Sequence, residues 1–433
     1  MAKTVLVVGA GYAGLSAAHY TLKHIIPALP NKGEEYSLTL VDPSDEFFAR
    51  PAAPRAVVSD KLLPNEQCFL DFQSHFKQYG PDKFLFIKGK ATALDYTART
   101  VTVTKSSGET ETVAYYALII ATGTLSASPL LGLHKDVEFV KDSWKAFQAA
   151  VPKAKSIVIA GGGPAGIETA GELGDFLNGK AGLFRSKLEN PKCHITVVCA
   201  DSKILPVLRP AIAAQAEKYL AKVGVTVIKN VRVESVSPEG AGEEDSATGD
   251  LSKVTQAAKV KLSNGETVDA DIYLPATGLR PNASWLPKEL LTEAGYADTN
   301  GTTLRVDKAG ARVYAIGDVG SYSRGGIMDL LYDAFPVLAT NVKRDLLHFA
   351  SVGDSDGVAA EKATPPGKDR QYKEKLSETQ LVPIGRSMGV GALFGWRLPS
   401  FMVWVIKGRD YMLSFAPPSV DGSKWAKEIK WSG

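Results

Sequence analysis

Two glycine-rich turns with the same spacing are the residues of this sequence best suited to chemistry. They are Gly9-x-Gly11-x-x-Gly14 and Gly161-x-Gly163-x-x-Gly166. Each follows a run of apolar, mostly β-branched residues, which predicts a strand that turns directly into a helix. Only glycine lets the chain turn this tightly and bring backbone N–H groups up to a pyrophosphate, at a helix N-terminus that favours negative charge. The two turns therefore predict two pyrophosphate-binding sites in one chain.

Each glycine turn, together with the strands and helices around it, predicts one nucleotide-binding unit. A carboxylate follows the second strand of each unit. Asp42 ends the strand expected over residues 36–41, where it can accept hydrogen bonds from a ribose diol. A turn or helix-capping role is the alternative for Asp42. Asp201 follows the strand expected over residues 195–198, slightly late for the same task, and no arginine pair for a 2′-phosphate stands beside it. This pattern weakly favours NADH over NADPH at the second site.

Three further turns extend the pattern. Ala121-Thr122-Gly123 ends one predicted strand, a second Ala-Thr-Gly ends at Gly278, and Gly317-Asp318 ends another strand. A Gly-Asp pair alone is a common turn dipeptide. After two glycine turns and two Ala-Thr-Gly turns, however, Asp318 is expected to contact the ribityl chain of FAD.

Glu168 lies just inside the helix that follows the second glycine turn. The helix dipole alone would favour a carboxylate there, without any chemical role. The alternative is that Glu168 lies between a flavin and a nicotinamide and orients the stacked rings.

The elements that must position these residues alternate between strands and helices, which predicts parallel sheets. Residues 88–105 and 110–120 indicate additional strands between the two units. We predict an α/β protein with two Rossmann-like, glutathione-reductase-type dinucleotide-binding domains plus a C-terminal α+β segment. The expected divisions are residues 1–127 and 279–350 for FAD, 128–278 for NAD(P)H, 351–375 as a linker and 376–433 closing the site. The polar residues 237–258 and 353–375 are expected to be excursions from the core, the former within a hairpin.

The composition excludes several other classes of protein. The 433 residues carry 50 basic and 47 acidic side chains and no basic run, which argues against nucleic-acid binding. The three cysteines, Cys68, Cys193 and Cys199, form no C-x-x-C pair and fit a reducing compartment. No apolar run reaches the ~18 residues of a membrane-spanning helix. The expected location is cytoplasmic, with peripheral contact to an intracellular membrane left open.

Five ordered motifs over the first ~320 residues resemble the pyridine nucleotide-disulfide oxidoreductase superfamily. They are the two glycine turns, Ala121-Thr122-Gly123, Thr277-Gly-Leu-Arg-Pro281 and Ala315-Ile-Gly-Asp318. Within it, the chain is most similar to the apoptosis-inducing-factor-like branch of the ferroptosis-suppressor type, and more distantly to type II NADH dehydrogenases. The residues that carry this likeness are Val41-Asp-Pro-Ser-Asp-Glu-Phe47, Arg55-Ala56, Ala339-Thr-Asn-Val342 and Lys407-Gly-Arg-Asp410.

The resemblance implies FAD at the first glycine turn, NADH or NADPH at the second, and a quinone as electron acceptor. Lys407 would lie beside the flavin and the acceptor, where a cation favours reduced flavin; an ordinary surface lysine is the alternative. The chain departs from the ferroptosis-suppressor type at Met412, at Ala334 and at Ala2, which replaces a myristoylated glycine. The acceptor therefore need not be ubiquinone.

The C-terminal residues 396–415 form an apolar run with two interpretations. They could form an interfacial helix that dips into a bilayer or a core helix that covers the flavin domain.

The sequence thus predicts an FAD-dependent NAD(P)H oxidoreductase that passes two electrons to a small, quinone-like acceptor. A redox-sensing flavoprotein with slow turnover and a tailoring oxidase of a specialised metabolite are the alternatives, and a homodimer is left open. No metal site is expected. Lys407 and Glu168 are the predicted catalytic residues. The predicted cofactor-binding residues are Gly9, Gly11, Gly14, Asp42, Arg50, Ala121, Thr122, Gly123, Gly161, Gly163, Gly166, Gly278, Gly317 and Asp318.

Overall fold

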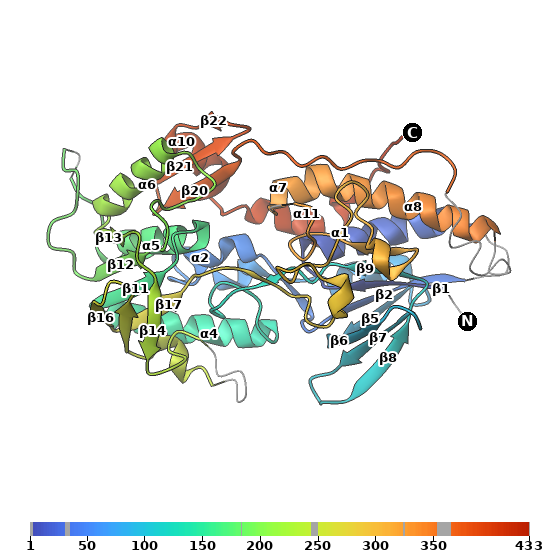
Figure 1. The fold of residues 1–433 in the computed structure, drawn as a ribbon, viewed down its shortest axis with the longest axis horizontal. Coiled ribbons are helices and arrows are strands. Elements are labelled where there is room, and N and C mark those ends of the chain that lie inside the picture. Colours follow the sequence, from blue (N-terminus) through green and yellow to red (C-terminus); the bar gives the residue numbers. More distant parts are fainter. Residues whose placement is uncertain are drawn as a thin grey trace.

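Two parallel sheets stand side by side along the long axis of the molecule, and the C-terminal segment runs across both (Figure 1). The computed structural model describes residues 3–30, 35–182, 184–243, 250–323, 325–352 and 365–432. Residues 353–364 of the second predicted polar excursion and residues 244–249 of the first lie outside the described residues.

The first sheet has five parallel strands in the order β19-β9-β1-β2-β5. These strands are β1 (Lys3–Val8), β2 (Tyr36–Asp42), β5 (Phe84–Lys88), β9 (Ala117–Ile120) and β19 (Val313–Ala315). Val5 and Val7 of β1 belong to the core formed with helices α1 (Tyr12–Tyr20) and α8 (Phe335–Val352). Because side chains alternate along a strand, Leu6 and Val8 face the other way. There they meet the antiparallel sheet of β6 (Lys90–Asp95), β7 (Thr100–Thr104) and β8 (Thr110–Ala114).

The second parallel sheet repeats this three-layer arrangement. Its strands follow the order β13-β12-β11-β17, with β11 (Ser156–Ala160), β12 (His194–Val198), β13 (Val225–Ile228) and β17 (Ile272–Pro275). Ile157 and Ile159 face the core that contains helices α4 (Val137–Ala150), α5 (Pro164–Leu177) and α6 (Pro210–Lys222). Val158 and Ala160 face the antiparallel strands β14 (Val233–Ser237), β15 (Ala258–Leu262) and β16 (Thr267–Ala270).

Short elements join the two units. Strands β10 (Thr124–Leu125) and β18 (Arg280–Pro281) form an antiparallel pair at the two crossings of the chain. Smaller elements of the N-terminal part are β3 (Glu46–Phe48), α2 (Ala53–Ala56), β4 (Phe69–Asp71) and α3 (Gln73–Phe76), of which α2 packs against α5, and α7 (Ile327–Asp329) follows β19. The predicted domain boundaries fall close to the β10–β18 pair and stay a prediction.

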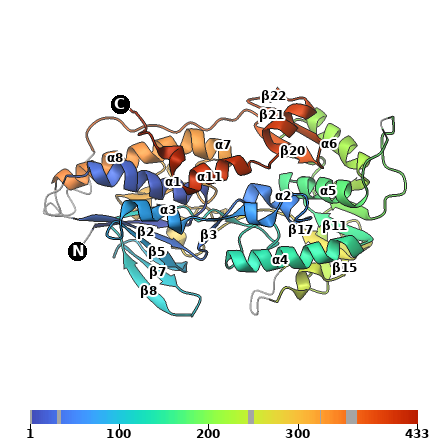
Figure 2. The ribbon, with the colours of Figure 1, turned by 180° about the vertical axis from the view of Figure 1, so that it is seen from behind.

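The C-terminal segment binds both units (Figure 2). Residues 365–379, here called the strap, run along the molecule to the antiparallel strands β20 (Gln380–Ile384), β21 (Met388–Leu393) and β22 (Trp396–Arg397). This small sheet contacts α5 and α6 of the second unit. The chain then passes through α10 (Ser400–Val403) and the π-helical turn η12 (Trp404–Gly408) and returns to α1 through α11 (Ala416–Val420).

The predicted fold class is confirmed: an α/β protein with two Rossmann-like parallel sheets. The first polar excursion indeed lies between the paired strands β14 and β15. Residues 396–415 do not form the single helix that either interpretation expected: the stretch divides into β22, α10 and short helical turns, with Phe401 66% and Val405 50% exposed but Val403 and Tyr411 fully buried. Among the described residues, no helix combines the length and apolarity needed to cross a bilayer.

Candidate functional site

A cavity of about 630 Å³ lies between the two parallel sheets and receives residues from both units and from the C-terminal segment. Thirteen predicted site residues line it: Gly9, Gly11, Asp42, Arg50, Ala121, Thr122, Gly123, Gly163, Glu168, Gly278, Gly317, Asp318 and Lys407. Gly14, Gly161 and Gly166 are outside the lining. The structure thus brings together residues that lie up to about 400 positions apart in the sequence.

Gly9 and Gly161 make the two strand-to-helix turns. Gly9 has a φ of +106°, and a Cβ atom there would lie 2.4 Å from the Ala121 carbonyl oxygen. Gly161 has a φ of +130°, and its Cβ would lie 2.3 Å from the Ala276 carbonyl oxygen. Each turn is therefore closed to any side chain by an Ala-Thr-Gly turn next to it, which explains why these motifs occur together.

Gly14 and Gly166 act one turn later, where helix meets strand. A Cβ at Gly14 would lie 1.7 Å from the Gly9 carbonyl oxygen, and one at Gly166 would lie 2.3 Å from the Gly161 carbonyl oxygen. These two glycines hold the helices close to the sheets, so they shape the cavity from outside its lining.

Gly11 and Gly163 differ from the other four. They are the N-cap residues of α1 and α5, and a Cβ at either would meet no atom within 4 Å. Packing of the protein therefore does not require glycine at these positions. Open space in front of a helix N-terminus fits the close approach of a phosphate.

Asp42 is fixed at the end of β2 by two backbone groups. The amide of Ala10 donates to Oδ2 at 2.7 Å and the amide of Ser44 donates to Oδ1 at 2.8 Å. Burial raises the pKa of the Asp42 carboxyl to about 6, against the effect of these hydrogen bonds. Its oxygens retain lone pairs for a diol at the cavity wall.

Arg50 places a cation in the same cavity. Nε donates to the Leu131 carbonyl at 3.0 Å, and Nη1 donates to the carbonyl and hydroxyl of Thr124 at 2.9 and 3.0 Å. Within the described ranges, no carboxylate forms an ion pair with Arg50, and burial lowers its pKa. A partly buried cation whose hydrogen-bond acceptors are neutral fits a site that takes an anionic group.

Glu168 and Lys407 form an ion pair on the cavity wall. Lys407 Nζ lies 2.5 Å from Glu168 Oε1 and 3.2 Å from the Leu381 carbonyl oxygen. The exposed fractions of the two side chains are 3% for Glu168 and 14% for Lys407, so Lys407 is not an ordinary surface lysine. Burial raises the pKa of Glu168 to about 6, and the charge of Lys407 partly offsets this effect.

Several lining residues were not predicted as site residues from the sequence. Tyr12 stands at a variable position of the first glycine turn, and its ring meets the Phe47 ring edge-on at 4.8 Å between centroids. Pro54 and Leu330 add apolar surface. Tyr12 carried a usable signal because it lies inside the first glycine turn, and so did Thr277 and Leu279, which lie inside the Thr277–Pro281 motif.

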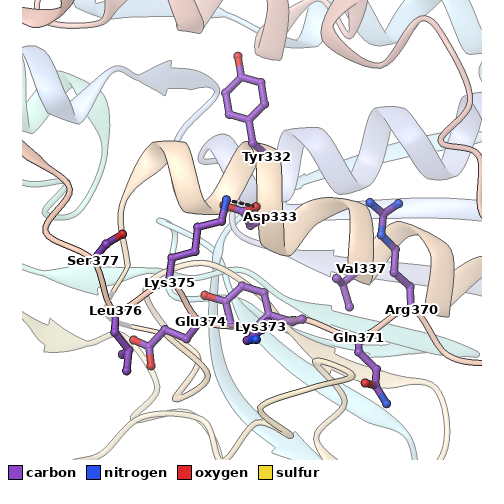
Figure 3. Close-up of a pocket in the computed structure, with 11 residues that line it drawn as sticks. Tyr332, Asp333, Val337, Arg370, Gln371, Lys373, Glu374, Lys375, Leu376 and Ser377 are labelled. Carbon is purple, nitrogen blue, oxygen red and sulfur yellow. Dashed lines mark hydrogen bonds and ion pairs between the residues drawn. The ribbon is translucent and has the colours of Figure 1, made fainter. Parts of the chain in front are cut away.

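A second hollow of about 490 Å³ lies under the strap, away from these residues (Figure 3). Its wall includes Tyr332, Arg370 and an ion pair between Lys375 and Asp333. None of the predicted site residues lines this hollow, so it is not the candidate active site.

Comparison with known proteins places the chain in a family. The model of the pyridine nucleotide-disulphide oxidoreductase family matches residues 3–335. The chain belongs to this family.

This chain is similar in sequence to two relatives and in fold to one solved structure. Oxidoreductase phnG of Penicillium herquei is 50% identical over 425 residues, covering 98% of this chain and 97% of that protein. Ferroptosis suppressor protein 1 of Xenopus tropicalis is 25% identical over 419 residues, covering 95% and 94%. The sulfide:quinone oxidoreductase of Aquifex aeolicus shares the fold with a TM-score of 0.61 at 17% identity, covering 97% and 92%.

The family resemblance predicted from the motifs is therefore confirmed, including its likeness to ferroptosis suppressor proteins. The chain is an oxidoreductase of a flavin-dependent, pyridine nucleotide-using family. The part taken by each cavity residue, the exact cofactors and the acceptor belong to the proposal below.

Proposed function

We propose that the protein binds FAD along the first unit and NADH along the second, and passes two electrons to a quinone-like acceptor. The observation that carries this proposal is that two open glycine turns, at Gly11 and Gly163, line one and the same cavity. Two dinucleotides bound there would extend from opposite sides toward the Glu168–Lys407 pair. Bound flavin would supply the hydride and electron chemistry that no amino-acid side chain provides.

In this proposal the first unit binds and orients the cofactor. The amides at the N-terminus of α1 and the Arg50 guanidinium bind the pyrophosphate, and Asp42 accepts hydrogen bonds from the adenosine ribose. Asp318, which lines the cavity and is exposed within it, would hold the ribityl hydroxyls. Ala121, Thr122, Gly123 and Gly317 bring their backbone close to the same group.

The second unit would bind the nicotinamide nucleotide through Gly163 and Gly278. Asp201 lies exposed just beyond β12, where a carboxylate can accept hydrogen bonds from a ribose and repels a 2′-phosphate. This placement supports NADH rather than NADPH.

Lys407 and Glu168 would serve the reacting end of the cavity. The ammonium stabilises negative charge that develops beside it, and a carboxyl with a pKa of about 6 can hold or release a proton near neutral pH. The nearby apolar residues Pro54, Leu330 and Met412 suit a flat, apolar acceptor. The sulfide:quinone oxidoreductase of similar fold supports a quinone as the acceptor class.

We also propose peripheral membrane contact through the C-terminal segment. Phe394, Trp396, Phe401, Trp404 and Val405 are 37–79% exposed. Three exposed basic residues, Arg386, Arg397 and Arg409, and no acidic one lie in residues 380–409. Aromatic rings with flanking cations favour an anionic lipid surface. The three buried, free cysteines fit a reducing location, so we propose the cytoplasmic face of an intracellular membrane.

Anaerobic titration of the purified protein tests the proposed function. A yellow protein that bleaches with NADH and regains its colour with menadione or a ubiquinone analogue supports it. A protein that stays colourless after incubation with FAD refutes it. Fast reoxidation by oxygen with no response to quinones would instead indicate an oxidase.

A further inference from the structure

A second buried ionic cluster lies directly behind the Glu168–Lys407 pair. Arg55 comes from α2, which precedes the first chain crossing in sequence and packs against α5, Glu172 comes from α5 of the second unit, and Tyr411 from the C-terminal segment. Arg55 Nη2 lies 2.8 Å from Glu172 Oε1, and the Tyr411 hydroxyl donates to the same oxygen at 2.9 Å. The Arg55 side chain is 7% exposed and that of Glu172 is fully buried. The cluster thus joins all three parts of the chain at one point.

Arg55 also holds the backbone that carries Lys407. Its Nη1 donates to the Gly408 carbonyl oxygen at 2.6 Å, and its guanidinium lies 4.6 Å from the centroid of the Tyr411 ring. Gly408 ends the π-helical turn η12, where carbonyl groups lose their partners within the helix. The guanidinium therefore supplies a partner that the helix cannot.

The backbone after this point has an uncommon conformation. Tyr411 and Met412 have φ values of +51° and +63°, so two successive residues with side chains are left-handed. Such residues persist where their surroundings hold them in place. Lys407 and Met412, on either side of the held carbonyl, both line the cavity.

We infer that Arg55 is a positioning residue that fixes the 404–412 segment, and so directs the Lys407 ammonium to Glu168 at the cavity wall. No other described side chain binds the Gly408 carbonyl, Glu172 and the Tyr411 ring together. Lysine cannot replace it, because a single ammonium lacks the planar fork that meets a carbonyl and a carboxylate at once.

Helix α5 receives the C-terminal segment along one face. Glu168, Glu172 and Asp175 follow at helical spacing and are all buried. Glu168 accepts from Lys407, while Asp175 Oδ2 accepts from the Arg386 amide at 2.7 Å. Of the three carboxylates, only Glu172 is bound to the first unit as well, through Arg55. Loss of Arg55 should therefore loosen the middle of this contact while leaving Asp175 in place.

Hydrogen–deuterium exchange of the full-length protein as purified tests the positioning role. In Arg55→Lys, the amides of Arg409, Tyr411 and Leu413, which are bonded within the segment, should exchange about ten-fold faster or more. Tyr411→Phe removes only the hydroxyl bond to Glu172 and should produce a smaller change in the same peptides. If Arg55→Lys does not fold, the test becomes whether Tyr411→Phe raises amide exchange in these peptides.

Arg305→Lys is the matched control. Arg305 binds Asp345 and Asp369 at 2.7–2.9 Å and so holds the strap rather than the 404–412 segment. Its replacement should raise exchange in the strap and leave the Tyr411 region unchanged. Unchanged exchange around Tyr411 in folded Arg55→Lys, or equal loosening by Arg305→Lys, would overturn the inference.

The consequence for the reaction rests on the proposed function and has its own readout. A displaced Lys407 no longer offsets the burial of Glu168, so the limb of the pH profile of acceptor reduction that Glu168 produces should move to higher pH in Arg55→Lys. An unmoved limb in flavin-loaded Arg55→Lys would overturn the positioning role. Failure of the wild-type protein to bind flavin would sink the proposed function, whereas the exchange result would still stand.

Discussion

Replacing Lys407 by methionine tests how strongly the cavity depends on the Glu168–Lys407 pair. Methionine retains the length and much of the volume of lysine but leaves Glu168 without its cation. Burial raises the pKa of Glu168 from 4.5 to about 6 even with Lys407 present. The neutral form therefore favours folding below pH 4.5, and this contribution is lost as the pH rises through 6.

The size of the effect follows from these two values. At 1.36 kcal/mol per pH unit, ionised Glu168 already costs the wild-type fold about 2 kcal/mol at pH 7. In Lys407→Met the carboxyl can keep its proton, and holding that proton at pH 7 costs about 3 kcal/mol relative to the solution pKa of 4.5. The variant should therefore lose about 1 kcal/mol at pH 7 through this carboxyl, and almost none near pH 4.5.

Urea unfolding between pH 5 and 8 measures this difference, with Lys407→Met/Glu168→Gln as the control. The double variant lacks the carboxyl, so its stability relative to wild type should not show the extra decline toward pH 8. A loss of stability in Lys407→Met that is as large at pH 5 as at pH 8 would refute the coupling between these two side chains. In the flavin-loaded protein, Lys407→Met should slow acceptor reduction more than flavin reduction by NADH; equal slowing would remove its role at the acceptor.

Further predictions concern the glycine turns, a buried histidine and nucleotide choice. Gly14→Ala should disrupt folding of the first unit, because its Cβ would overlap the Gly9 carbonyl, whereas Gly11→Ala should melt like wild type yet retain little FAD on a desalting column. Burial lowers the pKa of His19 to about 4, so stability should be constant above pH 6.5 and fall by up to about 3 kcal/mol as the pH drops to 4; His19→Gln should abolish that slope in urea titrations. Asp201→Ala should lower the KM for NADPH relative to that for NADH, and an unchanged ratio would place nucleotide selection elsewhere.

The parts of the fold that the sequence predicted are those with local causes. A strand, a glycine turn and a helix are specified within about fifteen residues, so both nucleotide-binding units could be located from the motifs at Gly9 and Gly161. The alternation of Val5, Leu6, Val7 and Val8 between two cores likewise follows from the pleat of one strand.

The parts that the sequence did not predict depend on contacts between distant residues. Arg55 and Glu172 are 117 positions apart, and Glu172 and Tyr411 are 239 apart, and no local pattern links them. The left-handed backbone at Tyr411 and Met412 has no glycine to announce it. The apolar run after residue 396 looked like one helix, but Pro399 and the π-helical turn divide it, so its large side chains face outward.

The most direct test of the central claim is the fate of deuterium in NADH labelled on one or the other face of nicotinamide C4. If the two glycine turns hold the nicotinamide flat against flavin, flavin reduction should remove all the label from one isomer and none from the other. The recovered NAD⁺ can be weighed by mass spectrometry after a single anaerobic turnover. Loss of label from both isomers, or NADH that leaves the flavin oxidised, would contradict two nucleotides facing each other in this cavity.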